Sequence, residues 1–411
     1  MIDYRNKPWW LLMTVPIVIN CCIGLSYQTM GVYLSAYVMG NLGATATQFG
    51  LVSTIWTVVA CIMRPASGPL AQKFGTKTIM LIGLAVWTAM IVAFGFVPTF
   101  AVWAVCRVIQ CFGHATSYTL SQAAAAEAAP KGDLGKAANL YVGIPQVLAV
   151  VIGPAIGLAF IGDNQWQRFF LLTSLIALLG IVLGIIFLPG KKQSEELMEL
   201  NNAAYKEQNT IMMDAAIEYH GIWKVLEKSA LPASIIMVFC SFAHLAMMFF
   251  SAYVVAQYGE LGGAAIFSSL YGLMQLPLMF VLGPIQDKFG TKVIFIPAVL
   301  FCALATALLA MGNTNWVMLG IISGIGQAGI KPVLNGQLVK ACPMNRVTVA
   351  TGTYQMANGV GLGLAAFFGG LVIDNLGWAA MWWYCGILFV LCGVACLFVI
   401  KEPWLKAKKA A

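Results

Sequence analysis

Polar and basic side chains recur at helical spacing inside apolar stretches of this chain. Steps of three and four residues return to the same face of a helix, so such residues form one polar stripe. The clearest stripe, between residues 100 and 128, consists of Arg107, Gln110, His114, Ser117 and Ser121. A second stripe, with one member at every fourth position, consists of Ser323, Gln327, Lys331 and Asn335. Polar groups are costly in apolar surroundings and usually face a cavity.

Two further segments carry similar polar positions. One holds Asn20, Tyr27, Gln28 and Ser35, and the other holds Ser241, His244 and Ser251. From the four stripes we predict a set of substrate-binding residues: Arg107, His114, Gln110, His244, Lys331, Gln327, Asn335, Asn20, Tyr27 and Gln28.

The signs of these groups indicate the ligand. Arg107 and Lys331 are positive, and the two histidines can become so, whereas every nearby acid lies at the end of an apolar segment: Glu127, Glu260, Asp287 and Asp374. Fixed positive charge without a carboxylate suits an anion and repels lipophilic cations. Structural alternatives stay open: Arg107 could bond helix carbonyls, Lys331 could extend toward the membrane surface, and each histidine could simply bond a neighbour.

Catalytic chemistry is not indicated. The sequence shows no nucleophile–base spacing, phosphate-binding loop or cluster of metal ligands, so we expect no enzyme, no cofactor and no metal. The 11 cysteines lie mostly within apolar runs and form no CxxC pair. They are interpreted as small buried residues and not as a disulfide framework.

The segments that carry the stripes must be membrane helices. Hydrophobic residues make up 60% of the 411 residues and charged residues only 9%, against roughly 25% charged in soluble domains. Mean hydropathy is +0.85. This composition excludes a soluble enzyme, a nucleic-acid binder and a disordered chain, and it supplies about twelve helices of roughly 20 apolar residues.

The chain therefore predicts an all-α polytopic membrane protein with twelve spans in two halves. The first six spans are 10–36, 48–69, 78–97, 100–128, 137–161 and 168–189. The last six are 230–257, 264–285, 292–312, 315–340, 347–373 and 378–400. This divides the chain into an N-terminal bundle (1–189), a polar cytoplasmic linker (190–229) and a C-terminal bundle (230–411).

Basic residues fix the expected orientation. With the N-terminus inside, 19 of the 23 Lys and Arg residues fall in cytoplasmic segments, and only Arg168 falls in an outer loop. The positive-inside rule then predicts cytoplasmic termini in a plasma membrane, which we expect to be a bacterial inner membrane. The net charge of +8 is explained by loops that face the lipid bilayer surface, and no nucleic acid is required.

A ten-residue loop occurs twice, after the second and the eighth predicted span. Gly68-Pro-Leu-Ala-Gln-Lys-Phe-Gly-Thr-Lys77 and Gly283-Pro-Ile-Gln-Asp-Lys-Phe-Gly-Thr-Lys292 are identical at seven positions and lie 215 residues apart. The repeat indicates that the two halves arose as a parallel duplication, a plan known among transporters.

These motifs resemble those of the major facilitator superfamily of secondary transporters. The loop matches the family signature except at Gln72, where the family usually has Asp, while the second copy keeps the acid as Asp287. Arg107-Val-Ile-Gln110-Cys-Phe-Gly113 is similar to a family motif of the fourth span, and Gly153-Pro154-Ala-Ile-Gly157 partly resembles an exporter motif of the fifth. The resemblance implies the major facilitator fold, two pseudo-symmetric six-helix bundles, with spans 1, 4, 7 and 10 lining a central cavity.

The resemblance also implies a set of gating residues: Arg64, Gly68, Gln72, Lys73, Gly75, Lys136, Gly153, Pro154, Gly157, Gly283, Asp287, Lys288 and Gly290. Asp287 would pair with Lys136 at the start of span 5, whereas Gln72 leaves Arg346 near span 11 without an acidic partner. The simpler alternative is that Asp287 is a solvated loop charge worth roughly 0–1 kcal/mol.

We therefore expect a secondary transporter, acting as a monomer, for a small or amphipathic organic anion. It would work by alternating access, through anion exchange or through proton coupling at His114 or His244. One alternative is a proton-coupled multidrug exporter, which the partial Gly153-Pro154 motif favours. Another is a membrane receptor or scaffold that transports nothing, although such a protein has little reason to keep four polar stripes.

Overall fold

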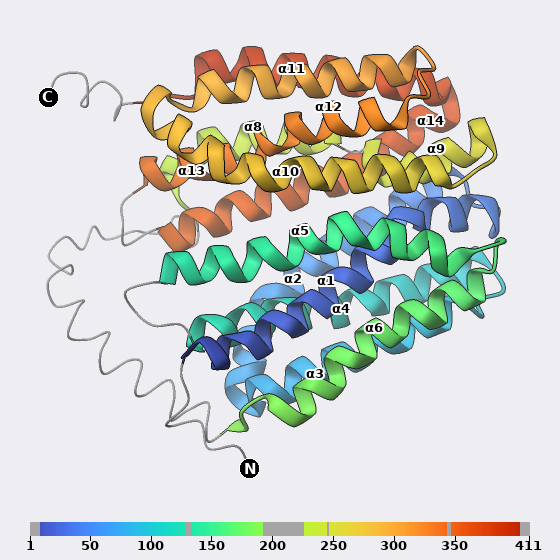
Figure 1. Ribbon diagram of the computed structural model, residues 1–411, viewed down its shortest axis with the longest axis vertical. Helices are drawn as coiled ribbons and strands as arrows, with labels where there is room; N and C mark the ends of the chain where they lie inside the picture. Colours follow the sequence, from blue (N-terminus) through green and yellow to red (C-terminus); the bar gives the residue numbers. More distant parts are fainter. Residues whose placement is uncertain (1–8, 129–133, 192–225, 245, 343–346, 403–411) are drawn as a thin grey trace, which may run out of the picture. The chain divides into compact units, whose positions relative to one another are not determined.

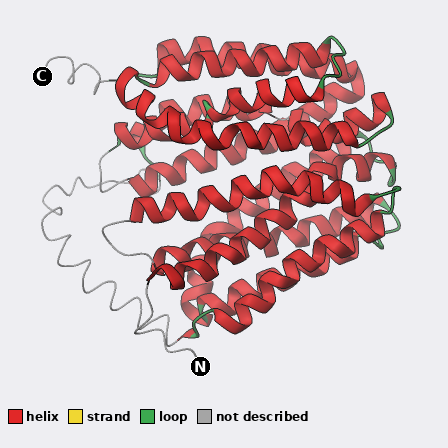
Figure 2. Ribbon diagram, viewed as in Figure 1, coloured by secondary structure: helices red, strands yellow, loops and turns green. Residues whose placement is uncertain are grey.

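A computed structural model describes residues 9–128, 134–191, 226–244, 246–342 and 347–402. The described residues form helices joined by short loops, and no strand occurs among them (Figure 2). Helix is the expected result because a membrane interior offers no water to backbone N–H and C=O groups, and a helix satisfies them within one segment.

Six helices form the first half of the chain (Figure 1). Their bounds are α1 Trp9–Gly40, α2 Ala46–Phe74, α3 Thr76–Phe94, α4 Phe100–Ala128, α5 Leu134–Ile161 and α6 Trp166–Phe187. Each coincides with one of the first six predicted spans.

The second half matches the last six predicted spans but contains breaks. Its helices are η3 Lys228–Ala230, α8 Leu231–His244, α9 Ala246–Tyr258, α10 Gly262–Phe289, α11 Thr291–Ala310, α12 Trp316–Ala328, α13 Lys331–Ala341 and α14 Val347–Val399. Predicted span 7 corresponds to α8 and α9, which lie on either side of residue 245, a position outside the described residues. Predicted span 10 is broken into α12 and α13. The last two spans are the two arms of α14, which meet at Gly377, where φ is 83° and the backbone is not helical.

Length and apolar composition identify most of these helices as membrane spans. Among the described residues, eight helices are long and apolar enough to cross a membrane, or nine if the bent α10 counts as one span. Their outward faces are apolar as well, because Phe280 and Phe398 are each 78% exposed. Exposed apolar surface of this kind is suited to lipid and not to water. The prediction of an all-α polytopic membrane protein is confirmed.

The duplicated segment builds the same structure in both halves, but it is mostly helix and not the predicted loop: residues 68–74 end α2, residues 283–289 end α10, and the turn itself is a single glycine. Gly75 ends α2 with φ at 92°, and Gly290 ends α10 with φ at 93°, a conformation that favours glycine. Two residues later, the Lys77 ammonium donates to the carbonyl of Leu188 at 2.9 Å, and the equivalent Lys292 donates to the carbonyl of Leu397 at 2.7 Å. Both cations therefore neutralise carbonyls at the end of a helix, where the helix dipole is negative.

The chain divides into two compact units. Unit 1 contains Met1–Gly31 and Val59–Ala216, and unit 2 contains Val32–Val58 and Ile217–Ala411. In unit 1, α3 packs on α4 and α6, with Ile19, Met80 and Leu84 among the buried apolar residues. In unit 2, α14 packs on α8 and α11, with Met237, Phe295 and Phe389 in the core. The boundary crosses α1 between Gly31 and Val32 and α2 between Val58 and Val59, so each helix has residues in both units.

Candidate functional site

The predicted substrate-binding residues fall into two groups, one in each unit. Unit 1 holds Asn20, Tyr27, Gln28, Arg107, Gln110 and His114, and unit 2 holds His244, Gln327, Lys331 and Asn335. Each group is described by itself, and the ligand-binding role of all ten residues stays a prediction.

Arg107 lies within a chain of polar contacts in unit 1. Its guanidinium, 8% exposed, donates a short hydrogen bond to the side-chain oxygen of Gln110, one helical turn away on α4. The Gln110 amide in turn donates to the Met30 sulfur on α1 at 3.6 Å. Because Gln110 is fully buried, it fixes one side of the guanidinium. Two members of the predicted α4 stripe, Arg107 and Gln110, are therefore in direct contact, as their spacing of three residues allows.

His114 is enclosed by aromatic rings. The ring centroids of Tyr27 and Trp87 each lie 4.9 Å from that of His114, and the Tyr118 ring stacks on it at 5.5 Å with an angle of 11°. Trp87 is held in place because its indole N–H donates to the Ser26 hydroxyl at 3.1 Å. The cage gathers residues from α1, α3 and α4 around one imidazole.

Arg64 belongs to the same group, although the sequence assigned it to the gate. It lies on α2 and is partly buried, and its positive charge, like that of Arg107, is close enough to act on His114. Its buried Nε atom has no hydrogen-bond partner among the described residues. Unit 1 therefore gathers two guanidinium groups and one imidazole.

The two predicted residues of α1 at the edge of this group differ in their surroundings. Asn20 is 1% exposed, and within the described chain its side-chain nitrogen finds no hydrogen-bond partner. Gln28 lies where α5 approaches α1: a Cβ on Gly153 would lie 3.1 Å from the Gln28 Cβ. The predicted gating glycine Gly153 thus permits close packing of α5 on α1, and Pro154 and Gly157 next to it are also buried.

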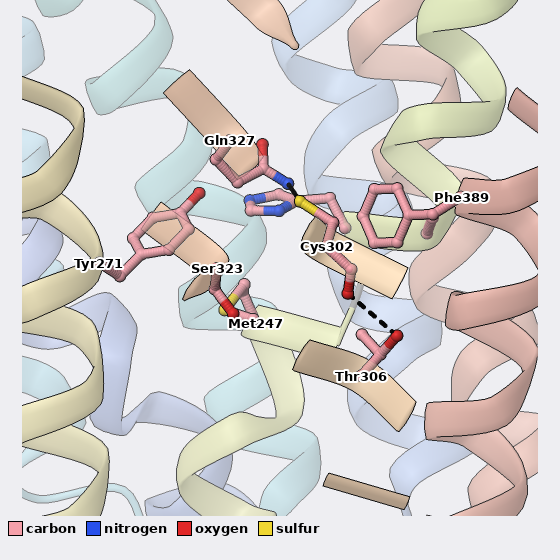
Figure 3. A pocket seen from close by; sticks show the side chains of 9 residues that line it. Met247, Tyr271, Cys302, Thr306, Ser323, Gln327 and Phe389 are labelled. Atoms are coloured by element: carbon pink, nitrogen blue, oxygen red, sulfur yellow. Dashed lines mark hydrogen bonds between the residues drawn. The ribbon is translucent and has the colours of Figure 1, made fainter. Parts of the chain in front are cut away.

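Unit 2 contains a small cavity with a mainly apolar lining and a few polar side chains, large enough for about one water molecule (Figure 3). His244 and Tyr271 face each other across it with centroids 6.0 Å apart. The Gln327 amide lies 3.8 Å from the Cys302 sulfur, to which it donates. The full lining is Ala243, His244, Met247, Tyr271, Cys302, Thr306, Ser323, Gln327 and Phe389. Two predicted residues, His244 and Gln327, are therefore brought together.

Lys331 lies at the break within predicted span 10. α12 ends at Ala328 and α13 begins at Lys331 with Pro332 in its first turn, so a helix N-terminus and a lysine occur at the same point. The Tyr354 hydroxyl donates to the Lys331 carbonyl at 3.0 Å. The side chain of Lys331 is exposed, and its charge acts on His244. One turn further, the buried Asn335 side-chain oxygen has no hydrogen-bond partner among the described residues.

The predicted gating residues of the loops take distinct positions. Asp287 forms an ion pair with Lys340 of α13, and its side chain is 64% exposed. The side chains of the expected partner Lys136 and of Gln72 lie outside the description, as does Arg346. Lys73 and Lys288 each lie over the next phenylalanine ring, at 5.3 Å and 5.1 Å, while Gly68 and Gly283 are exposed.

Sequence reasoning missed the aromatic and sulfur groups that complete both sites. Trp87, Tyr271, Cys302 and Tyr354 lie on helices outside the four predicted cavity spans, and none of them is among the predicted site residues. One signal was available: Trp87 and Cys302 are 215 residues apart, the offset of the repeated loop. Each contacts the stripe of the neighbouring helix, at His114 and at Gln327 respectively.

Comparison with known proteins identifies the family. The family model described as Major Facilitator Superfamily matches residues 17–261 and 233–411. The chain therefore belongs to the Major Facilitator Superfamily and is a membrane transporter of that family.

Relatives and solved structures are similar but distant. The "Uncharacterized MFS-type transporter YfhI" of Bacillus subtilis (strain 168) is 21% identical over 96% of this chain and 94% of its own length. The "Multidrug resistance protein B homolog" of Mycobacterium tuberculosis (strain CDC 1551 / Oshkosh) is 28% identical over 39% of this chain and 33% of its own length. The chain thus matches about a third of that relative, and likewise 35% of the Bacillus subtilis transporter YfiU.

The solved structures share the fold. The inward-open structure of the xylose transporter XylE from E. coli superimposes with a TM-score of 0.73 at 15% identity, covering 98% of this chain and 100% of that chain. The nucleoside transporter NupG also gives a TM-score of 0.73, at 14% identity, covering 95% and 99%. At these identities the likeness shows the fold alone, and it confirms the major facilitator fold predicted from the sequence.

Proposed function

We propose that this transporter carries a small or amphipathic organic anion by alternating access, with both termini in the cytoplasm of a bacterial cell. The observation that supports the anion is the sign of the charges. In the described helices, Arg64 and Arg107 lie away from the helix ends and Lys331 lies at the break between α12 and α13, whereas the acids lie in loops or near other helix ends. A ligand carboxylate, sulfonate or phosphate would supply the missing negative charge.

Three features make the sites suited to an amphipathic anion. Arg107 is held by Gln110 in one orientation, which lowers the entropic cost of binding. The rings around His114 offer an apolar surface next to the guanidinium groups. Lys331 adds its ammonium to the positive end of α13, and broken helices supply such ends to anionic substrates in other transporters.

Coupling follows from the same groups. We propose either exchange of one anion for another or movement of a proton with the substrate on His114 or His244. Exchange requires no carboxylate in the cavity, which agrees with the charges of the described helices. We also propose that the protein works as a monomer, whose partners are its substrate, a coupling proton or exchanged anion, and the lipid bilayer.

A ligand screen tests the proposal that the substrate is an organic anion. Purified protein would be heated with a panel of organic anions and lipophilic cations, and we expect ligand-dependent stabilisation by anions, since a ligand that binds the native state raises its melting temperature. The Lys331→Ala variant should lose most of this stabilisation. Stabilisation by lipophilic cations that survives Lys331→Ala would reject the anion proposal.

The second candidate is a multidrug exporter. It is favoured by the printed names of relatives, such as the "Multidrug resistance protein B homolog", and by the aromatic rings around His114, which could bind flat apolar molecules. In the same screen an exporter would bind several unrelated lipophilic compounds, and Trp87→Ala would weaken all of them, while Lys331→Ala would change little.

A further inference from the structure

A carboxylate of α14 accepts hydrogen bonds from backbone N–H groups at the beginning of α2, within unit 2. The backbone N–H groups of Ala46 and Thr47 donate to the two oxygens of Asp374, at 3.1 Å and 2.8 Å. The next free donor, the Gln48 N–H, is satisfied by the Thr45 hydroxyl at 3.1 Å. The first turn of α2 is thus capped partly by its own sequence and partly by a residue 328 positions away. A carboxylate is stabilised there by the positive end of the helix dipole.

Below this cap, the two helices touch through small residues. A Cβ on Gly50 would lie 2.0 Å from the Ala366 carbonyl oxygen, and a Cβ on Gly370 would lie 2.4 Å from the Ala46 carbonyl oxygen. The Thr54 hydroxyl donates to the Gly363 carbonyl at 2.5 Å. The contact therefore brings backbone against backbone, as small residues allow between membrane helices.

A second contact lies beside the first, between the end of α1 and α9. The hydroxyls of Ser35 and Ser251 are 2.9 Å apart, and both residues are buried. Phe49 of α2 meets Phe249 of α9 edge to face, with centroids 5.4 Å apart. All of these residues belong to unit 2, although α1 and α2 continue into unit 1.

The polar contacts of this interface are few. Besides the Phe49–Phe249 contact, it consists of a charge on a helix end, two hydroxyl hydrogen bonds and glycine–backbone packing. Asp374 is exposed, so water can replace it on the N–H groups of Ala46 and Thr47. Hydrogen bonds at a wet helix end exchange with solvent at little net cost, so this end of the interface is the part that can open most readily.

We propose that Asp374 and the start of α2 form a latch that holds residues 32–58 on unit 2 and opens during the transport cycle. By the positive-inside rule this end of the helices is the outer one, so the latch closes the outer side of the transporter. The inference goes beyond substrate choice, and its test needs no substrate.

The first experiment measures how often the latch opens. A variant without the native cysteines would carry one cysteine at position 251, and purified protein in detergent would react with a maleimide. Asp374→Asn should raise the reaction rate about three- to tenfold, because the charge on the helix end is lost. Glu260→Gln, which removes another exposed acid of unit 2, is the matched control and should leave the rate unchanged. A variant that keeps only the native Cys396, which is fully buried in unit 2, reports unfolding, and its thiol should stay unreactive with either substitution.

The second experiment uses the serine pair. With Ser35→Cys and Ser251→Cys in the same background, mild oxidation should form a crosslink rapidly, and Asp374→Asn should slow it about three- to tenfold while Glu260→Gln does not. The proposal is wrong if Asp374→Asn alters neither the maleimide rate nor the crosslinking rate. Failure of the anion proposal would leave both results untouched, so the two ideas are tested separately.

Discussion

At the scale of single residues, the site in unit 1 depends on how one guanidinium is held. Arg107 is buried and fixed by Gln110, which is itself anchored to Met30. A charge held in this way keeps its orientation, which under the proposed function would favour an anion over a cation.

We expect Arg107→Ala to weaken binding of an organic anion by about 2–5 kcal/mol, since a desolvated charge-assisted contact is lost. Calorimetric titration with an anion found in the screen would measure the change. Arg168→Ala is the control, because Arg168 is exposed near the start of α6 and should change the affinity by less than about 0.5 kcal/mol. Equal losses in both variants would remove Arg107 from the site.

Single residues also show what the sequence could not give. The stripe on α4 was predictable because its members share one helix, and the Arg107–Gln110 contact follows from that spacing. The rings around His114 come from three helices, and the pairing of Asp287 with Lys340 depends on the packing of α13 against α10. Such contacts are set by tertiary packing, which the spacing of residues along a single helix does not determine.

At the scale of elements, glycines decide how closely the helices pack. Gly113, one turn from Gln110 on α4, faces α3. A Cβ at this position would lie 2.6 Å from both the Gly83 carbonyl oxygen and the backbone nitrogen of Trp87. The motif that the sequence identified around Arg107 therefore includes a residue whose role is to let α3 bring Trp87 up to His114.

Gly113→Ala should destabilise the protein by about 1–3 kcal/mol, as overpacking does when backbone atoms must move. Gly352→Ala on α14 is the matched control, since a Cβ there meets nothing within 4 Å. It should be neutral or slightly stabilising because alanine favours helix. Thermal unfolding in detergent would compare the two, and a Gly113→Ala variant as stable as Gly352→Ala would mean that α3 and α4 pack less tightly than described.

The elements themselves were largely predictable, and their interruptions were only partly so. From apolar runs of the right length, the bounds of the described helices could be predicted to within a few residues. The break in span 10 follows Gly329 and precedes Pro332, two residues that commonly interrupt helices, yet a continuous span was predicted because the apolar pattern runs through them.

At the scale of the whole molecule, the distribution of basic residues predicts the topology. Single cysteines at positions 98 and 314, in a background without native cysteines, should react with an impermeant reagent applied to intact cells, because both lie in predicted outer loops. A cysteine at position 205, in the predicted cytoplasmic linker, should react only after the membrane is permeabilised. Labelling of position 205 in sealed cells would reverse the assigned orientation.

The passage of α1 and α2 from one unit to the other also bears on how the chain matures. Residues 32–58 are synthesised early, but Asp374, which caps Ala46 and Thr47, follows 328 residues later. Contacts so distant in sequence form late and slowly. The ribosome therefore releases the start of α2 long before its partner exists, and unit 2 cannot complete its structure until nearly the entire chain has been inserted. During that interval the Gly50 face of α2 lacks its α14 partner, so this face is exposed to lipid or to a chaperone.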